Sequence, residues 1–174
     1  MVQNVKEVPY GVSDFRTMVE QNIYYVDKTM YIPELEKQAR YIIFIRPRRF
    51  GKSIFLGMLH AYYDCRTKSK FQQWFGNLWI GKRPTPSQGR YQVLHLDFSM
   101  VGGNIDNLEE KFNFYLGVQL NGFVRYYDEY YSDMIKQNVY ATQDAGGKLA
   151  IIQNEAKMKD YPLYLIIDEY DNFT

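Results

Sequence analysis

Tyr41-Ile42-Ile43-Phe44-Ile45 is followed directly by Arg46-Pro47-Arg48-Arg49-Phe50-Gly51-Lys52-Ser53, and this stretch decides the fold. The first part is a continuous apolar run rich in β-branched and aromatic residues, which predicts a strand buried on both faces of a parallel sheet. Pro47 ends the strand. From Lys52 onward, apolar residues recur at helical spacing and predict an amphipathic helix, namely at Phe55, Met58, Leu59 and Tyr62. A basic loop between such a strand and such a helix is the context of a phosphate-binding loop.

The eight loop residues Arg46–Ser53 are the predicted nucleotide-binding residues. In such loops the backbone N–H groups and the helix dipole converge on one anion. We expect Lys52 to reach the β- and γ-phosphates, Ser53 to ligate Mg²⁺, and Gly51 to admit close backbone approach. The general pattern G-x-x-x-x-G-K-[ST] has glycine where this chain has Arg46, so the loop's first turn is expected to differ. The alternative is a surface turn before a core helix, with Arg48 and Arg49 as solvated charges.

A second apolar run, Leu163–Ile167, ends in Asp168 and Glu169. Open α/β sheets bind their ligands at the carboxyl ends of parallel strands. We expect Asp168 to hold Mg²⁺ opposite Ser53, and Glu169 to orient or deprotonate the attacking water as a catalytic residue alongside Lys52. The alternative is that the two acids begin a surface loop, which is also the simpler interpretation of Asp171. The two motifs, of Walker A and Walker B type, predict an ATPase that uses ATP and Mg²⁺.

The rest of the chain alternates between segments with apolar residues at helical spacing and short apolar runs typical of strands. A strand is predicted at 93–98, and helices are predicted from Phe15 to Val19 and over 34–40, 108–135 and 148–159. Residues 64–90 are polar, turn-rich and aromatic, and are predicted to form an insertion that packs onto the domain. This order predicts an α/β fold with a mostly parallel sheet.

Composition narrows the class of protein. The chain has 174 residues, 46% of them hydrophobic and 24% charged, with a net charge of +1, which fits one globular domain rather than a disordered chain. The single cysteine, Cys65, excludes an internal disulfide. No signal-peptide core or membrane-length apolar run is present, so a soluble, cytoplasmic protein is expected, without a membrane partner. The local basic cluster coincides with the predicted loop, so direct nucleic-acid binding has weak support.

Five segments together resemble the AAA-ATPase-like family of bacterial and archaeal P-loop proteins, whose full-length members often carry a C-terminal restriction-endonuclease-like nuclease domain. They are Pro9–Phe15, Tyr24–Thr29, Arg46–Ser53, Leu94–Ser99 and Ile166–Asp171. The family accepts arginine in place of the first loop glycine. The resemblance implies ATP as the nucleotide and a three-layer P-loop fold of the additional-strand type, with strand order 5-1-4-3-2.

The resemblance also implies that the segment Pro9–Thr29 lies near the adenine. Tyr10 and Tyr25 are candidates to stack on it, although core packing is the favoured alternative for each. Strands 4 and 5 of the implied sheet would follow Thr174. We therefore expect the N-terminal part of a longer ATPase domain, with a segment 1–40, a core 41–174 and the insertion 64–90. Residues 1–174 on their own could lack the ATPase activity of the whole domain. Nucleic acid would be reached through a nuclease domain outside them, and the oligomeric state stays open.

Two other functions remain as alternatives to hydrolysis coupled to a conformational change. The first is a non-hydrolytic ATP-dependent switch linked to a nuclease domain, which would not need Glu169. The second is a small-molecule kinase, for which no acceptor site or lid is readable. GTP specificity is disfavoured because no N-K-x-D motif occurs in these residues.

Overall fold

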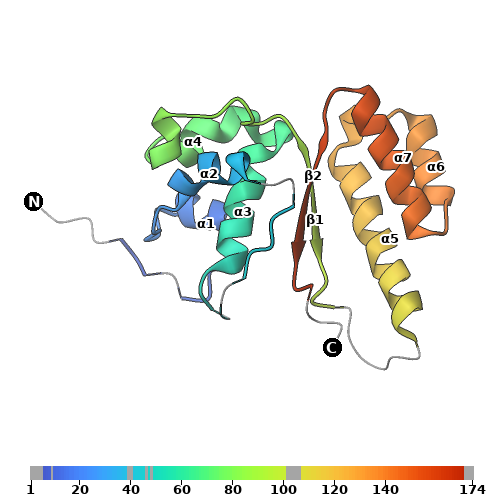
Figure 1. The fold of residues 1–174 in the computed structure, drawn as a ribbon, viewed down its shortest axis with the longest axis horizontal. Helices are drawn as coiled ribbons and strands as arrows, with labels where there is room; N and C mark the ends of the chain where they lie inside the picture. The colour runs from blue at the N-terminus through green and yellow to red at the C-terminus, as the bar shows by residue number, and fades with distance from the viewer. Residues whose placement is uncertain are drawn as a thin grey trace, which may run out of the picture. The chain divides into compact units, whose positions relative to one another are not determined.

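A computed structural model of the chain describes residues 6–8, 10–38, 41–45, 47, 49–100 and 107–170. Their Cα positions fall into two compact units, residues 1–89 and residues 90–174. The first unit is helical in its described part, and the second combines helices with a pair of parallel strands (Figure 1). The chain is therefore a mixed α/β protein, as the alternating pattern predicts.

The first unit contains four α-helices and three short 3-10 helices in its described residues. They are α1 (Phe15–Glu20), η1 (Thr29–Tyr31), α2 (Ile32–Lys37), α3 (Lys52–Tyr63), η2 (Cys65–Lys70), α4 (Phe71–Phe75) and η3 (Trp79–Lys82). Aromatic rings form much of the core between them. The Phe15 and Phe75 centroids lie 5.1 Å apart, and those of Tyr62 and Phe75 lie 5.5 Å apart. The segment predicted as an insertion thus folds as short helices whose aromatic residues enter this core.

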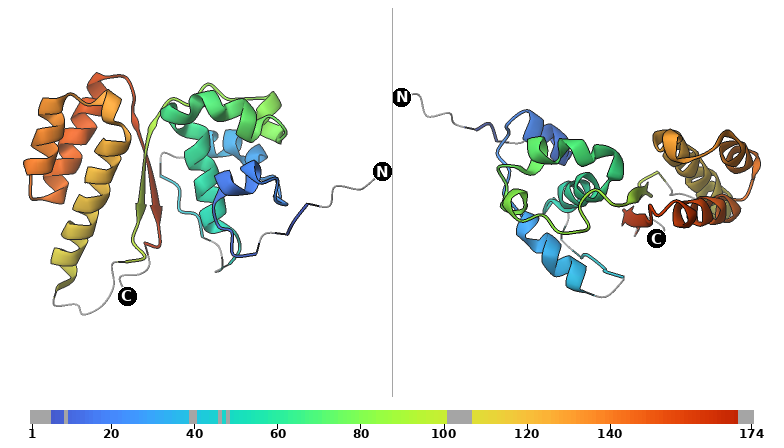
Figure 2. Two further views of the ribbon diagram at one scale, coloured as in Figure 1. Left: turned by 180° about the vertical axis from the view of Figure 1, so that it is seen from behind. Right: turned by 90° about the horizontal axis from the view of Figure 1, so that it is seen from above.

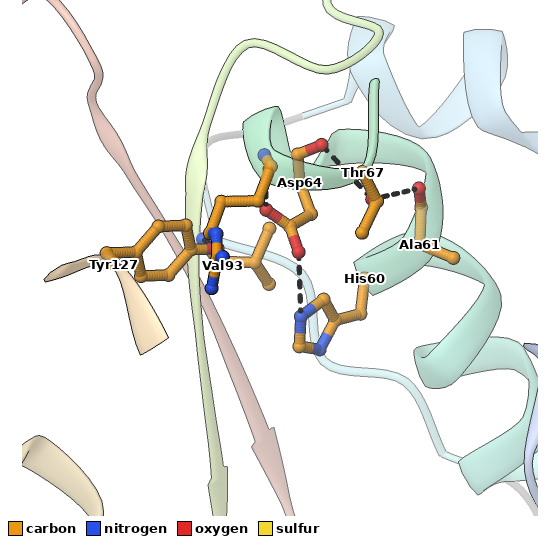
Figure 3. Close-up of polar contacts among 7 residues, drawn as sticks. His60, Ala61, Asp64, Thr67, Val93 and Tyr127 are labelled. Carbon is orange, nitrogen blue, oxygen red and sulfur yellow. Dashed lines mark hydrogen bonds and ion pairs between the residues drawn. The ribbon is translucent and has the colours of Figure 1, made fainter. Parts of the chain in front are cut away.

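Helix α3 carries the predicted phosphate loop at its start, so its anchoring matters for the site. The four residues of the predicted apolar stripe are all buried, which confirms this amphipathic helix. At the other end of α3, His60 Nε2 lies 3.6 Å from Oδ2 of the fully buried Asp64, and Thr67 Oγ1 donates to the Asp64 carbonyl oxygen (Figure 3). These contacts attach α3 to the chain that follows it.

Residues 41–45 form no strand, so this prediction was wrong. Tyr41, Ile43 and Ile45 expose 87%, 77% and 78% of their surface, whereas the Phe44 ring is partly covered, stacked on Phe55 at 4.9 Å. A strand needs a neighbour for its backbone hydrogen bonds. Within the described part of the chain no strand pairs with this run, so its composition alone does not make it a strand.

The second unit is built on two parallel strands, β1 (Gln92–Asp97) and β2 (Leu163–Asp168). Their register pairs Gln92 with Leu163 and Asp97 with Asp168, so the two strands end together. The helices between them are α5 (Leu108–Tyr126), α6 (Asp133–Ala141) and α7 (Ala145–Met158), with a 3-10 turn, η5 (Asp128–Tyr130), after α5. Figures 1 and 2 show these helices together on one side of the strand pair.

Side chains from the α5 region satisfy the outer edge of β1. The Val93 N–H donates to Tyr127 Oη at 2.7 Å, and the Asp97 N–H donates to Gln119 Oε1 at 2.8 Å. Gln119 Nε2 in turn donates to the Asp97 carbonyl oxygen at 3.1 Å. Because these two amides are occupied, β1 is partly protected as an edge strand against further pairing.

The helix predicted over 108–135 is interrupted, which corrects that boundary. α5 ends at Tyr126, and the Ser132 side chain accepts a hydrogen bond from the Ile135 N–H, so it caps a new helix, α6. A serine side chain that accepts a hydrogen bond from a backbone N–H three residues later favours the start of a new helix, here α6, over continuation of α5. Among the described helices, none has the length and apolar character that crossing a membrane requires.

Candidate nucleotide site

The backbone before α3 contains two residues in the left-handed conformation. Arg49 and Gly51 both have positive φ angles, 69° and 76°, and the Phe50 N–H donates to the Pro47 carbonyl oxygen at 3.3 Å. Residues that turn into the left-handed region in such a loop point successive N–H groups toward one side, which forms a concave donor site. Gly51 adopts this conformation without the cost that a Cβ would bring.

The predicted ligands of the phosphates follow immediately in the first turn of α3. Lys52 is half-buried and Ser53 is exposed. Gly51 occupies the N-cap position and, having no side chain, makes no side-chain cap for the helix. An anion at this position would be stabilised by the positive end of the α3 dipole. Arg46 and Arg48, also predicted here, lie outside the described residues.

A basic residue that sequence reasoning missed lies beside this loop. Lys28 Nζ is 3.6 Å from the position that a Cβ would take on Gly51. Lys28 belongs to the turn Asp27-Lys28-Thr29, and it is half-buried. One sequence signal pointed to Lys28, because its turn is among the segments that carry the family resemblance. Lys28 and Gly51 are, however, 51 − 28 = 23 positions apart, so the sequence did not indicate that they lie close together.

The two adenine candidates have different environments. Tyr25 packs edge-on against Phe15, with ring centroids 5.2 Å apart, which confirms core packing for this residue. Burial raises the pKa of the Tyr25 hydroxyl above its usual 10.0, and that hydroxyl is buried without a hydrogen-bond partner in the described part of the chain. Tyr10 is 99% exposed, so the expectation that it packs in the core was wrong.

The acids of the second motif lie where the strand pair ends. Asp168 is the last residue of β2 and is only 7% exposed, whereas Glu169 follows with a positive φ of 53° and donates its N–H to Asp168 Oδ1 at 3.0 Å. Asp97, the register partner of Asp168, is an additional acid at this edge that sequence reasoning did not assign.

The donor set of the two motifs fits a hard cation. Ser53 and Asp168 offer hydroxyl and carboxylate oxygens, which are the ligands that Mg²⁺ prefers. Within the described residues, no three acidic, histidine or cysteine side chains form a metal cluster on their own. Asp171 lies outside them. Ser53 belongs to the first unit and Asp168 to the second, and their side-by-side placement stays a prediction.

These features describe a mixed α/β protein with a glycine-containing loop at a helix start and an acid pair at a strand end. Comparison with known proteins gives the family: residues 9–174 match the family described as Predicted AAA-ATPase, and the chain belongs to it. A curated relative from Azotobacter chroococcum mcd 1, described as an uncharacterized protein in the vnfD 5′ region, is 44% identical over 55 residues. That match spans 31% of this chain and 11% of the relative. No solved structure matches the chain.

Proposed function

We propose that this chain binds ATP with Mg²⁺ through Arg46–Ser53, and that the ATPase domain to which it contributes hydrolyses the nucleotide. The observation that carries the proposal is the pair of left-handed residues, Arg49 and Gly51, directly before the uncapped start of α3. Membership of a family of predicted AAA-ATPases supports the same function.

The loop residues have distinct roles in this proposal. The backbone N–H groups of Arg49–Ser53 surround the phosphates, where a helix start and a concave turn both favour negative charge. Lys52 places a compact positive charge on the β- and γ-phosphates, and the Ser53 hydroxyl supplies a metal ligand. Loop binding of this kind positions the phosphates and needs no covalent step from the protein.

The acids at the end of β2 complete the proposed chemistry. Asp168 is the metal ligand opposite Ser53, and Glu169 orients the attacking water and accepts its proton. Mg²⁺, when bound, neutralises charge on the phosphate oxygens during transfer. These two roles fit the exposure of the side chains, because Asp168 is buried at the strand end and Glu169 is more exposed to water.

We further propose that the sheet is of the additional-strand P-loop type, with order 5-1-4-3-2. In this order strand 2 lies at the edge, parallel to strand 3. The pair β1–β2 has this relation, and β1 has its outer edge occupied by Gln119 and Tyr127.

Titration of the full-length protein with Mg·ATP tests the loop. Lys52→Ala is expected to abolish most of the binding, because it removes a charge-assisted contact to the phosphates. Lys37→Ala is the matched control. Lys37 is an exposed lysine on α2, paired with Glu34 at 2.9 Å, and such surface pairs contribute little to stability. Unchanged ATP affinity in a folded Lys52→Ala protein would reject the loop assignment.

Phosphate release separates hydrolysis from a non-hydrolytic switch. Glu169→Gln is expected to keep ATP binding and to lower turnover by roughly 10²–10⁴-fold, the usual contribution of a general base. Glu109→Gln, an exposed acid in the first turn of α5, is the control. Turnover at the wild-type rate in Glu169→Gln would remove Glu169 from the reaction. A wild-type protein that binds ATP without turnover would favour the switch.

A further inference from the structure

The turn Asp27-Lys28-Thr29 is held rigidly next to the phosphate loop. Asp27 Oδ1 accepts the Thr29 N–H at 2.8 Å and the Thr29 hydroxyl at 2.7 Å, while Asp27 Oδ2 accepts the Trp79 N–H at 2.7 Å. Thr29 is fully buried, and its Oγ1 accepts the Ile80 N–H at 3.1 Å. A carboxylate that accepts three hydrogen bonds fixes the backbone on both sides of Lys28.

The position of the Lys28 ammonium is unusual for a structural lysine. It lies 3.6 Å from where a Cβ of Gly51 would be, and it makes no hydrogen bond or ion pair with the described residues. Asp27, the adjacent acid, uses its carboxylate oxygens for the Thr29 and Trp79 groups instead. A half-buried cation without a protein counter-charge is normally stabilised by an anion or by water.

The loop supplies more positive charge of the same kind. Arg49 and Lys52 flank Gly51 on either side, and the start of α3 adds the positive end of a helix dipole. Lys28 Nζ lies beside Gly51 at this helix start, and negative charge that enters there is stabilised by the lysine and by the helix dipole. The polyphosphate that the loop is proposed to bind would supply this negative charge.

We propose that Lys28 is a second phosphate-binding lysine of this site, which contacts the nucleotide's phosphate oxygens beside Gly51, with Asp27 as its positioning residue. The inference rests on the proposed ATP-binding function. It assigns a direct role to the segment Tyr24–Thr29, which the family resemblance places near the nucleotide without stating what it does. The contact is to phosphate, so it contributes to ATP and ADP binding and not to adenosine binding.

The test is titration of the full-length protein with ATP, ADP and adenosine. Lys28→Met keeps the length of the side chain and removes its charge, and is expected to weaken ATP binding by roughly 10- to 100-fold, the range for a hydrogen bond to a charged group. Lys28→Arg keeps the charge and should retain most of the affinity. Lys37→Met, on the exposed face of α2 in the same unit, is the control and should bind ATP like the wild type.

The outcomes separate this inference from the function on which it rests. A wild-type protein that binds no ATP overturns both. Normal ATP binding by the wild type and by Lys28→Met overturns the role of Lys28 alone. An equal loss of ATP and adenosine affinity in Lys28→Met also overturns it, because the residue would then support the fold or the adenine pocket.

Lysine acetylation of the unmutated protein gives a second readout that does not depend on a variant folding. Bound ATP is expected to protect Lys28 and Lys52 from a small acylating reagent, measured by mass spectrometry, while Lys37 keeps its reactivity. Labelling of Lys28 that is the same with and without saturating ATP, while Lys52 is protected, would contradict the proposed contact.

Discussion

Replacing Gly51 with alanine should destabilise the start of α3 even though the site has room for a methyl group. Of the described residues, a Cβ at this position would meet Lys28 Nζ alone, at 3.6 Å, which is an ordinary contact distance. The cost is conformational, because φ is 76° and a left-handed residue with a Cβ costs roughly 1–2 kcal/mol. Gly51→Ala is therefore expected to lower the free energy of unfolding by about that amount, or to change the loop conformation and weaken ATP binding.

The same substitution at Gly57, one turn and a half along the same helix, should have the opposite sign. A Cβ on Gly57 would lie 3.8 Å from Phe15 in ordinary contact, and its backbone is helical. Glycine within a helix is about 1 kcal/mol less favourable than alanine, so Gly57→Ala is expected to stabilise the protein by up to that amount. The two alanine variants should differ by roughly 1–3 kcal/mol.

Urea unfolding followed by tryptophan fluorescence measures this difference directly. Both tryptophans, Trp74 and Trp79, lie in the first unit with Gly51 and Gly57, so the signal reports the unit that carries the substitutions. ATP titration of each variant gives the effect on the loop. If Gly51→Ala proved as stable as Gly57→Ala and bound ATP normally, the left-handed conformation assigned to Gly51 would be wrong.

Two further predictions concern the second unit. Tyr127→Phe should cost roughly 1–3 kcal/mol, because the buried Val93 N–H loses the hydroxyl that accepts its hydrogen bond, and Val93 amide exchange measured by mass spectrometry or NMR should accelerate. Unchanged exchange would argue against this edge contact. Burial lowers the pKa of Lys148 below 10.5, so its folded form binds fewer protons than the unfolded chain and wild-type stability should rise with pH just below 10.5. The Lys148 ammonium lies 3.0 Å from Asn121 Oδ1, so Asn121→Asp would pair it with a carboxylate and should raise the melting temperature at pH 7. This gain should vanish below about pH 4, where the new acid is protonated. The exposed control Asn154→Asp should show no gain.

The sequence was sufficient for the elements that carry their own evidence. Helix α3 follows from apolar residues at helical spacing, and β2 follows from a short apolar run that ends in acids. In each case the residues that the pattern needs are adjacent or one turn apart, so local sequence contains the information. The family was also identified correctly, because its motifs are distributed along nearly the whole chain.

The errors arose where the outcome depends on partners distant in the sequence. Residues 41–45 have the composition of β2, but a strand exists only where neighbouring backbone groups accept its hydrogen bonds. The break near Tyr127 depends on the Ser132 cap, which competes with continuation of α5. The proximity of Lys28 to Gly51 was not predicted, because the two residues lie in different turns and the periodicity of apolar residues does not indicate which turns lie close together.

The central claim is that the loop before α3 and the acids after β2 form one Mg·ATP site. The most direct measurement is a crystal structure of the full-length protein with Mg²⁺ and a non-hydrolysable ATP analogue. The account predicts that the Ser53 hydroxyl and an Asp168 carboxylate oxygen lie roughly 4–5 Å apart, on either side of one Mg²⁺ with metal–oxygen bonds of about 2.1 Å. Nucleotide bound elsewhere, or these two oxygens on different faces of the sheet, would contradict it.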